Sequence, residues 1–211
     1  DTDTDTDTDT DTDTDQSAMC PCAGDTWWAD KDTDATVHIR PTGAVDGWSD
    51  TLGTPSHPLT SLAEAQSVLS GNDTLHTVAM WPGEHSAAGE TITWLVEHNI
   101  TLTGCGPDDS TLSLTPASEA QAHLELGRGA DSTGAASANI SDLTLVATVS
   151  DLPLIHVNDG DNVNMSRLLL QGNGLVPLLI IGQSTAVVLQ ESSLINGAQA
   201  IWIEDSDVSL E

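Results

Sequence analysis

The chain has 211 residues and a formal net charge of −29, because 33 acidic residues are balanced by only four Lys and Arg residues. Binding to nucleic acid or to an anionic membrane surface needs clustered basic side chains, so this composition excludes both as partners. No apolar run reaches the length of a membrane-spanning helix, which excludes membrane insertion by that route.

Residues 1–15 are a strict Asp-Thr dipeptide repeat with eight Asp, seven Thr and no apolar side chain. Such a tract buries too little surface to offset its own ordering entropy, and its carboxylates repel one another. We therefore predict that residues 1–19 form an extended stalk. In extended backbone the Asp and Thr side chains point to opposite sides.

The threonines of the stalk offer hydroxyl groups for O-linked sugar, and dense glycans would restrict the backbone of the tract. The expected O-glycosylation sites are Thr2, Thr4, Thr6, Thr8, Thr10, Thr12 and Thr14. Loose Ca²⁺ binding by the alternating Asp is a weaker expectation, because residues 1–15 lack the Gly and the downstream Glu of an EF-hand loop. Alternatively, the stalk pairs as a strand with an exposed edge of a neighbouring copy.

Residues 20–58 contain many turn-forming Gly and Pro and are expected to form a junction and cap region, with one short strand at 36–40. The three cysteines, Cys20, Cys22 and Cys105, leave one thiol over or imply a bond outside the chain. We expect one of the first two to bond Cys105, which would attach the junction to the body of the protein. Their spacing does not favour a zinc site.

Residues 59–69 predict a helix. Thr60 and Ser61 are candidate N-caps, and Glu64 follows Ser61 by three residues, as in a capping box. Gly71 is placed to end the helix. The apolar side chains that fall on one helical face are Leu62, Ala65, Val68 and Leu69.

From residue 75 onward the pattern changes to short strands of period two, separated by Gly, Asn, Asp or Pro. Strands this short do not suit an ordinary sandwich. The clearest of them are expected at residues 77–80, 91–94, 99–102, 111–114 and 123–126.

The second half of the chain contains an internal repeat of about 21 to 25 residues. The matching segments are 139–145, 164–170 and 188–194; 154–157, 178–181 and 200–203; and 162–165, 186–189 and 207–210. Each repeat holds three short strands and must stack on its neighbours to bury its apolar face. This pattern predicts an all-β parallel solenoid. The inward ladders are expected to be Leu145, Leu170 and Leu194, and Ile155, Leu179 and Ile201.

The body of the chain resembles the pectin-lyase-like superfamily. Residues 37–43, the Gly-Thr-Pro turn at 53–58, the helix at 59–69 and residues 77–83 resemble its initial strand, turn, capping helix and first coil, and 99–104 resembles the start of its second coil. The resemblance implies a right-handed parallel β-helix with a short capping helix over residues 59–211. It implies little about activity, because this fold carries hydrolases, lyases, adhesins and structural proteins.

The Asp-Thr repeat resembles linkers of bacterial surface proteins and the dipeptide-repeat backbone of densely glycosylated extracellular fibrils. Together with the solenoid it predicts an extracellular or cell-surface structural protein, in which a glycosylated stalk carries a β-helix head that forms a fibre with copies of itself or decorates one. The alternatives are a β-helical polysaccharide hydrolase and a carbohydrate-binding module on a tether. We expect covalent glycans and no resident metal or cofactor, and we expect the natural chain to continue past residue 211.

The sequence favours a non-enzymatic role. A hydrolase needs converging carboxylates, and Asp159 and Asp161 are the best candidates for catalysis or cation binding. Asp in such a turn-like stretch more commonly serves turn geometry. A lyase acting on acidic polymers is disfavoured, because Arg128 and Arg167 are the only basic residues of the solenoid region and an acidic protein repels an acidic polymer.

Overall fold

The computed structural model describes residues 36–41, 53–54, 58–72, 74–127, 137–149, 151–160 and 162–211. The predictions for the Asp-Thr stalk, for Cys20 and Cys22, for Arg128 and for Asp161 lie outside these residues. Neither helix in the described ranges has the length and apolar content needed to cross a membrane.

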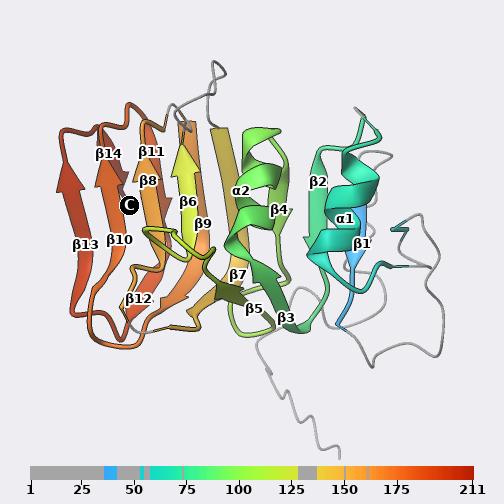
Figure 1. The fold of residues 1–211 in the computed structure, drawn as a ribbon, viewed down its shortest axis with the longest axis horizontal. Helices are drawn as coiled ribbons and strands as arrows, with labels where there is room; N and C mark the ends of the chain where they lie inside the picture. The colour runs from blue at the N-terminus through green and yellow to red at the C-terminus, as the bar shows by residue number, and fades with distance from the viewer. Residues whose placement is uncertain are drawn as a thin grey trace, which may run out of the picture.

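The described residues form a parallel β-solenoid of about five turns (Figure 1), which confirms the predicted all-β class. The elements are β1 (Thr36–Ile39), α1 (Leu62–Leu69), β2 (Thr77–Met80), β3 (Gly83–Ala88), α2 (Gly89–Glu97), β4 (Thr101–Thr103), β5 (Ser110–Thr115), β6 (Leu124–Gly127), β7 (Ser137–Ala147), β8 (Ile155–Asn158), β9 (Asn162–Gln171), β10 (Pro177–Gly182), β11 (Val187–Gln190), β12 (Ser193–Ile195), β13 (Gln199–Glu204) and β14 (Val208–Leu210).

The strands form two sheets in which neighbours always pair in parallel. The larger sheet has ten strands: β1, β2, β4, β7, β9, β11 and β14 follow one another, and β3, β5 and β12 pair beside them. The long strands β7 and β9 connect these two sets of strands. The first half of β7 pairs with β4 and its second half with β5. In the same way, β9 pairs first with β11 and then with β12. The smaller sheet has the order β13-β10-β8-β6 and closes the coil on its third side.

The two predicted inward ladders are confirmed. Leu170 pairs with Leu145 and Leu194, in the order that the sequence repeat predicts. The other ladder, Ile155, Leu179 and Ile201, is aligned in the same way on the smaller sheet. The last residue of each ladder is half-buried and the other two are fully buried, so the core continues through successive coils.

Two corners of the coil repeat the same backbone turn, in which one residue other than glycine has a φ between 46° and 59°. These residues are Asp142, Arg167 and Glu191 at one corner, and Asp159, Gln183 and Asp205 at the other.

Serine hydroxyls join the coils at these corners. The hydroxyl of Ser184 accepts the backbone N–H of Gly160 at 3.1 Å and donates to the carbonyl of Gly182 at 2.9 Å. Ser206 repeats this arrangement one coil later, accepting from Ser184 N–H and donating to Glu204. Ser192 does the same at the other corner, where it accepts from Leu168 and donates to Gln190. Each such hydroxyl satisfies one backbone donor that the turn would leave unpaired.

Helix α1 confirms the predicted helix and its cap. The Ser61 hydroxyl accepts the backbone N–H of Glu64 at 3.2 Å, and the Glu64 carboxylate accepts the backbone N–H and hydroxyl of Thr60 at 2.8 and 2.9 Å. The helix ends at Leu69, and Ser70 is its C-cap, directly before Gly71. Its buried side chains are Leu62, Ala65 and Leu69, while Val68 is half-buried.

The prediction of a strand at residues 91–94 is wrong, because these residues lie in helix α2. The β-branched residues of this segment favour a strand by local propensity. Ile92 and Leu95, however, are three residues apart, and each is only 1% exposed. A helix places both on one face, so burial against the solenoid overrides local propensity. Helix α2 contacts β6, the edge strand of the smaller sheet (Figure 1). The other four strands predicted in this half of the chain are confirmed within two residues as β2, β4, β5 and β6.

Candidate functional site

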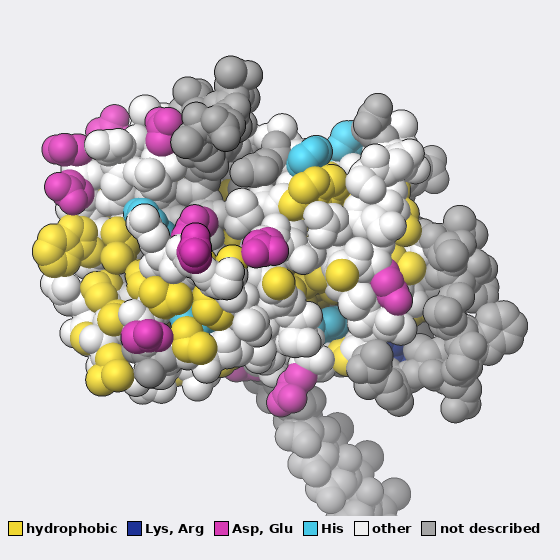
Figure 2. All heavy atoms as spheres, in the orientation of Figure 1, with side chains coloured by type: hydrophobic (Ala, Val, Ile, Leu, Met, Phe, Trp, Pro, Cys, Tyr) yellow, Lys and Arg dark blue, Asp and Glu magenta, His cyan; other side chains and the backbone are white. Residues whose placement is uncertain are grey.

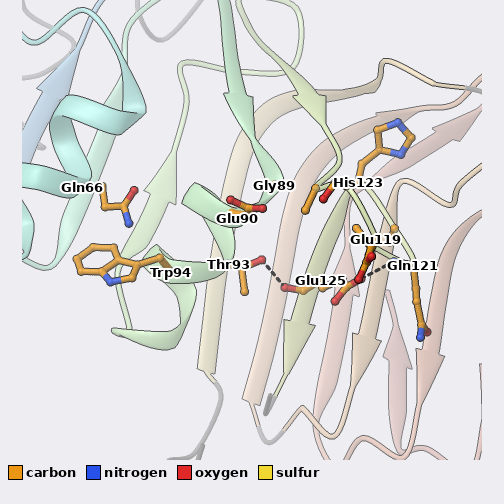
Figure 3. Close-up of a pocket in the computed structure, with 13 residues that line it drawn as sticks. Gln66, Gly89, Glu90, Thr93, Trp94, Glu119, Gln121, His123 and Glu125 are labelled. Atoms are coloured by element: carbon orange, nitrogen blue, oxygen red, sulfur yellow. Dashed lines mark hydrogen bonds between the residues drawn. The ribbon is translucent and has the colours of Figure 1, made fainter. Parts of the chain in front are cut away.

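A hollow with a volume of about 610 Å³ lies on the described surface where α2 meets β6 (Figure 3). Its walls come from three parts of the chain: α2, the segment 117–123 with β6, and Gln66 of α1. Hollows of a few hundred cubic ångströms are the usual size for binding small molecules.

Helix α2 presents its polar side to this hollow because its apolar side faces the core. Glu90, Thr93 and Trp94 line the hollow, whereas Ile92 and Leu95 are buried. The Thr93 hydroxyl donates to the backbone carbonyl of Glu125 at 2.9 Å and so joins the helix to β6.

A glycine lets the start of α2 approach the neighbouring segment closely. A Cβ atom at Gly89 would lie 2.0 Å from the backbone carbonyl oxygen of His123, much closer than atoms tolerate. Only glycine therefore fits at this contact without a shift of the backbone, and the contact closes one side of the hollow.

Three carboxylates line the hollow: Glu90, Glu119 and Glu125. Figure 3 shows Glu119 and Glu125 at one end and Trp94 with Gln66 at the other, with Thr93 between them. The Glu125 carboxylate is held by one of its oxygens, which accepts the backbone N–H of Gln121 at 2.6 Å.

His123 contributes no positive charge to the hollow in this arrangement. Its side chain is buried, and its Nε2 accepts the backbone N–H of Val149 at 3.0 Å. Its Nδ1 lies 2.9 Å from the carbonyl oxygen of Pro153 and must donate to it. A ring with one accepting and one donating nitrogen is neutral imidazole.

Trp94 supplies an aromatic surface at the other end. Its side chain is half-buried, and its ring stacks on His98 with 4.1 Å between the ring centroids and an interplanar angle of 23°. The His98 Nδ1 also lies 2.9 Å from the carbonyl oxygen of Trp94, which holds the imidazole in place.

A second hollow of about 360 Å³ lies further along the outer face of the smaller sheet. It is lined by His156, Asn158, Ile180, Ile181, Gly182, Gln183, Glu204 and Asp205. The outward residues Glu125, His156, Ile180 and Trp202 form a row in register across β6, β8, β10 and β13. Figure 2 shows apolar side chains over β10 and β13 and acidic side chains over β6 and α2, so this face carries both kinds of group.

Asp159, the predicted catalytic or cation-binding candidate, occupies a corner position. It is exposed, its φ is 54°, and its backbone N–H donates to Gly182 at 3.1 Å. Gln183 occupies the same corner of the next coil and donates in the same way to Glu204 at 3.1 Å. This equivalence supports a role in turn geometry for Asp159, which does not line either hollow.

Arg167 and Cys105 are both engaged in other interactions. The Arg167 guanidinium donates to both carboxylate oxygens of Asp142, at 2.5 and 2.7 Å, and this hydrogen bonding raises the pKa of Arg167. Cys105 is buried and disulfide-bonded. Which of the other two cysteines pairs with it stays a prediction, because both lie outside the described residues.

The sequence pattern does not indicate the larger hollow as a site. The sequence predicts a strand at 91–94, which does not place Thr93 and Trp94 together on the outer side of a helix. A helical spacing of Ile92 and Leu95 was the signal that could have placed them. Within the described ranges, no group of three or more His, Cys, Asp or Glu is arranged to hold a metal ion.

Comparisons with protein-family models, with curated proteins and with solved structures gave no match for this chain.

Proposed function

We propose that this chain is an extracellular structural protein of the pectin-lyase-like type, in which an O-glycosylated Asp-Thr stalk carries a right-handed β-solenoid head. The head forms a surface fibre with copies of itself or decorates one. The observation that best supports this proposal is the regular stacking of the coils, with shared inward ladders and serine-bonded corners. Stacked repeats of this kind make extended, stiff scaffolds.

The composition of the stalk supports the proposal that it is O-glycosylated. A bare Asp-Thr tract has eight carboxylates and no apolar group, so it gains nothing by ordering. Sugars on alternate residues add bulk, reduce backbone freedom and offer hydroxyl donors to the carboxylates. A stiffened stalk would hold the head away from the surface that carries it.

Mass spectrometry of the protein purified from its natural source tests this function. We expect an intact mass above that of the polypeptide, with the excess removed by β-elimination and absent when the seven stalk threonines are replaced by alanine. Replacing the stalk Asp residues by Asn is the matched control and should keep the sugars. An unmodified stalk in protein that neither forms nor attaches to fibres in electron micrographs would contradict the proposal. Polysaccharide hydrolysis that is lost in Asp159→Asn would favour a hydrolase.

A carbohydrate-binding role for the head is the second candidate. It is supported by the larger hollow, which combines the Trp94 ring with the amide of Gln66, the hydroxyl of Thr93 and the carboxylate of Glu125. Aromatic rings bury the apolar face of a ligand, and a few polar groups fix its orientation.

Titration with soluble oligosaccharides, followed by calorimetry, tests the second candidate. We expect Trp94→Ala to weaken binding and Trp202→Ala, outside the larger hollow, to leave it unchanged. If no oligosaccharide binds, or if only the Trp202 variant loses binding, the larger hollow is not a carbohydrate site.

A further inference from the structure

We propose that the larger hollow, taken as the carbohydrate site of the second candidate function, binds a saccharide that carries a protonated amine. The inference rests on that candidate function and adds the chemical class of its ligand. It follows from the charge of the hollow, from the way its polar groups are held and from its size.

The hollow is negatively charged, and no positively charged side chain in its lining balances this charge. Of the 13 residues that line it, three are glutamates and none is Lys or Arg. The remaining titratable residue, His123, is neutral because its Nε2 accepts a backbone N–H. A ligand with a carboxylate or sulfate would be repelled, whereas a protonated amine would be attracted.

One carboxylate of the hollow is oriented before a ligand arrives. Glu125 is fixed by the N–H of Gln121 at its carboxylate and by the hydroxyl of Thr93 at its backbone carbonyl. The carboxylate is exposed, so its second oxygen can accept from a ligand at the end where Glu119 also lies (Figure 3). An ammonium group has three donors and can bond more than one carboxylate of the hollow.

The size and the far end of the hollow favour a ring-bearing ligand over a bare cation. A volume of about 610 Å³ greatly exceeds the space of one ion, and the described residues do not include a metal-ligand cluster. Trp94 and Gln66 lie opposite Glu119 and Glu125 (Figure 3). A sugar ring can place its apolar face on the indole while its hydroxyl groups bond the amide.

Binding of three trisaccharides to the full chain at pH 6 tests the inference. The probes are β-1,4-linked trimers of glucosamine, N-acetylglucosamine and glucose, which differ chiefly at one substituent per ring. We expect the glucosamine trimer to bind about tenfold more tightly than the other two and to weaken as salt is added. Glu125→Gln should lose most of this preference, because its amide oxygen still accepts from Gln121 but its charge is gone.

Glu84→Gln is the matched control, because it removes the same charge from an exposed residue of β3 outside the hollow. It should bind like the unmodified protein. An equal loss in Glu84→Gln and Glu125→Gln would show that the overall charge attracts the amine, and would overturn the proposed site. Chemical denaturation of both variants verifies that each is folded.

The remaining outcomes distinguish the requirement for an amine from carbohydrate binding itself. Equal binding of all three trimers overturns the amine requirement and leaves the carbohydrate function standing. If none of the trimers binds, both fail. A linear triamine that binds as tightly as the glucosamine trimer, with the same loss in Glu125→Gln, overturns the saccharide part.

Discussion

At the scale of single residues, the corners of the solenoid contain residues with a left-handed backbone conformation. Six corner positions have positive φ, and none of them is a glycine. The residue types are Asp, Glu, Gln and Arg, so the turn is held by its surroundings and not by one favoured side chain. The serine hydroxyls and the backbone bonds between coils supply that support.

A valine at a corner should therefore destabilise the fold. Gln183→Val places a β-branched residue at a φ of 51°, and we expect the free energy of unfolding to fall by about 1 to 2 kcal/mol. Gln190→Val makes the same substitution within strand β11, where a β-branched residue is favourable. Urea denaturation of both variants measures the difference. Equal effects would contradict the assigned corner.

His85 should make stability depend on pH. Burial lowers the pKa of His85 below its ordinary value of 6.5, with partial opposition from its bond to the Trp81 carbonyl. The folded state therefore binds fewer protons than the unfolded state between the lowered pKa and 6.5. Stability from this group is complete above 6.5 and decreases as the pH falls through that window.

Urea denaturation at several pH values checks this dependence, with His85→Gln as the comparison. The difference in unfolding free energy between the native chain and the variant should shrink as the pH falls below 6.5. A difference that stays constant, or that grows on acidification, would show that His85 is not buried in its neutral form.

At the scale of secondary-structure elements, the solenoid ladders are the most predictable feature and α2 the least. The same apolar positions recur in each repeat because every coil must bury the same three faces, so Leu145, Leu170 and Leu194 could be aligned from the sequence alone. Helix α2 breaks the repeat, and its β-branched residues carry the local preference of a strand.

The larger hollow could not be predicted because its residues are distant in the sequence. Gln66, Thr93 and Glu125 come from α1, α2 and β6, and only the folded coil brings them together. The corner positions could not be predicted from the sequence either. Arg167, Gln183 and Glu191 occupy them, and none of these is a residue type that favours turns.

Leu170→Ala tests the packing of a ladder. The side chain is fully buried between two leucines, so we expect a loss of about 2 to 5 kcal/mol in unfolding free energy. Leu175→Ala is the same change at a residue that is 69% exposed, and it should alter stability by less than about 0.5 kcal/mol. Similar losses in both variants, measured by thermal and urea denaturation, would disagree with the ladder.

Gly89→Ala tests the contact between α2 and the segment that closes the larger hollow. The added methyl meets the His123 carbonyl, and we expect a cost of about 1 to 3 kcal/mol. Gly71→Ala, whose Cβ would have its nearest neighbour at 3.7 Å, should be close to neutral. Calorimetric unfolding gives both values, and a neutral Gly89→Ala would show that α2 is not held against this segment.

At the scale of the whole molecule, the parallel stack explains how an acidic chain with four basic residues still forms a continuous core. In the described residues, carboxylates lie on outer faces and at corners, while apolar ladders fill the interior. The ligand proposed for the larger hollow depends on this stack, because the stack fixes which side chains share the outer face.

Disulfide trapping tests the stack most directly. Adjacent strands lie about 4.8 Å apart, within disulfide reach, whereas strands two coils apart lie about 10 Å apart and exceed the limit of about 7 Å. In His156→Cys/Ile180→Cys the two cysteines are register partners on neighbouring coils, and we expect an intrachain cross-link on mild oxidation, detected by peptide mass spectrometry. His156→Cys/Trp202→Cys spans two coils and should not cross-link. Cross-linking of the second pair without the first would contradict the parallel solenoid.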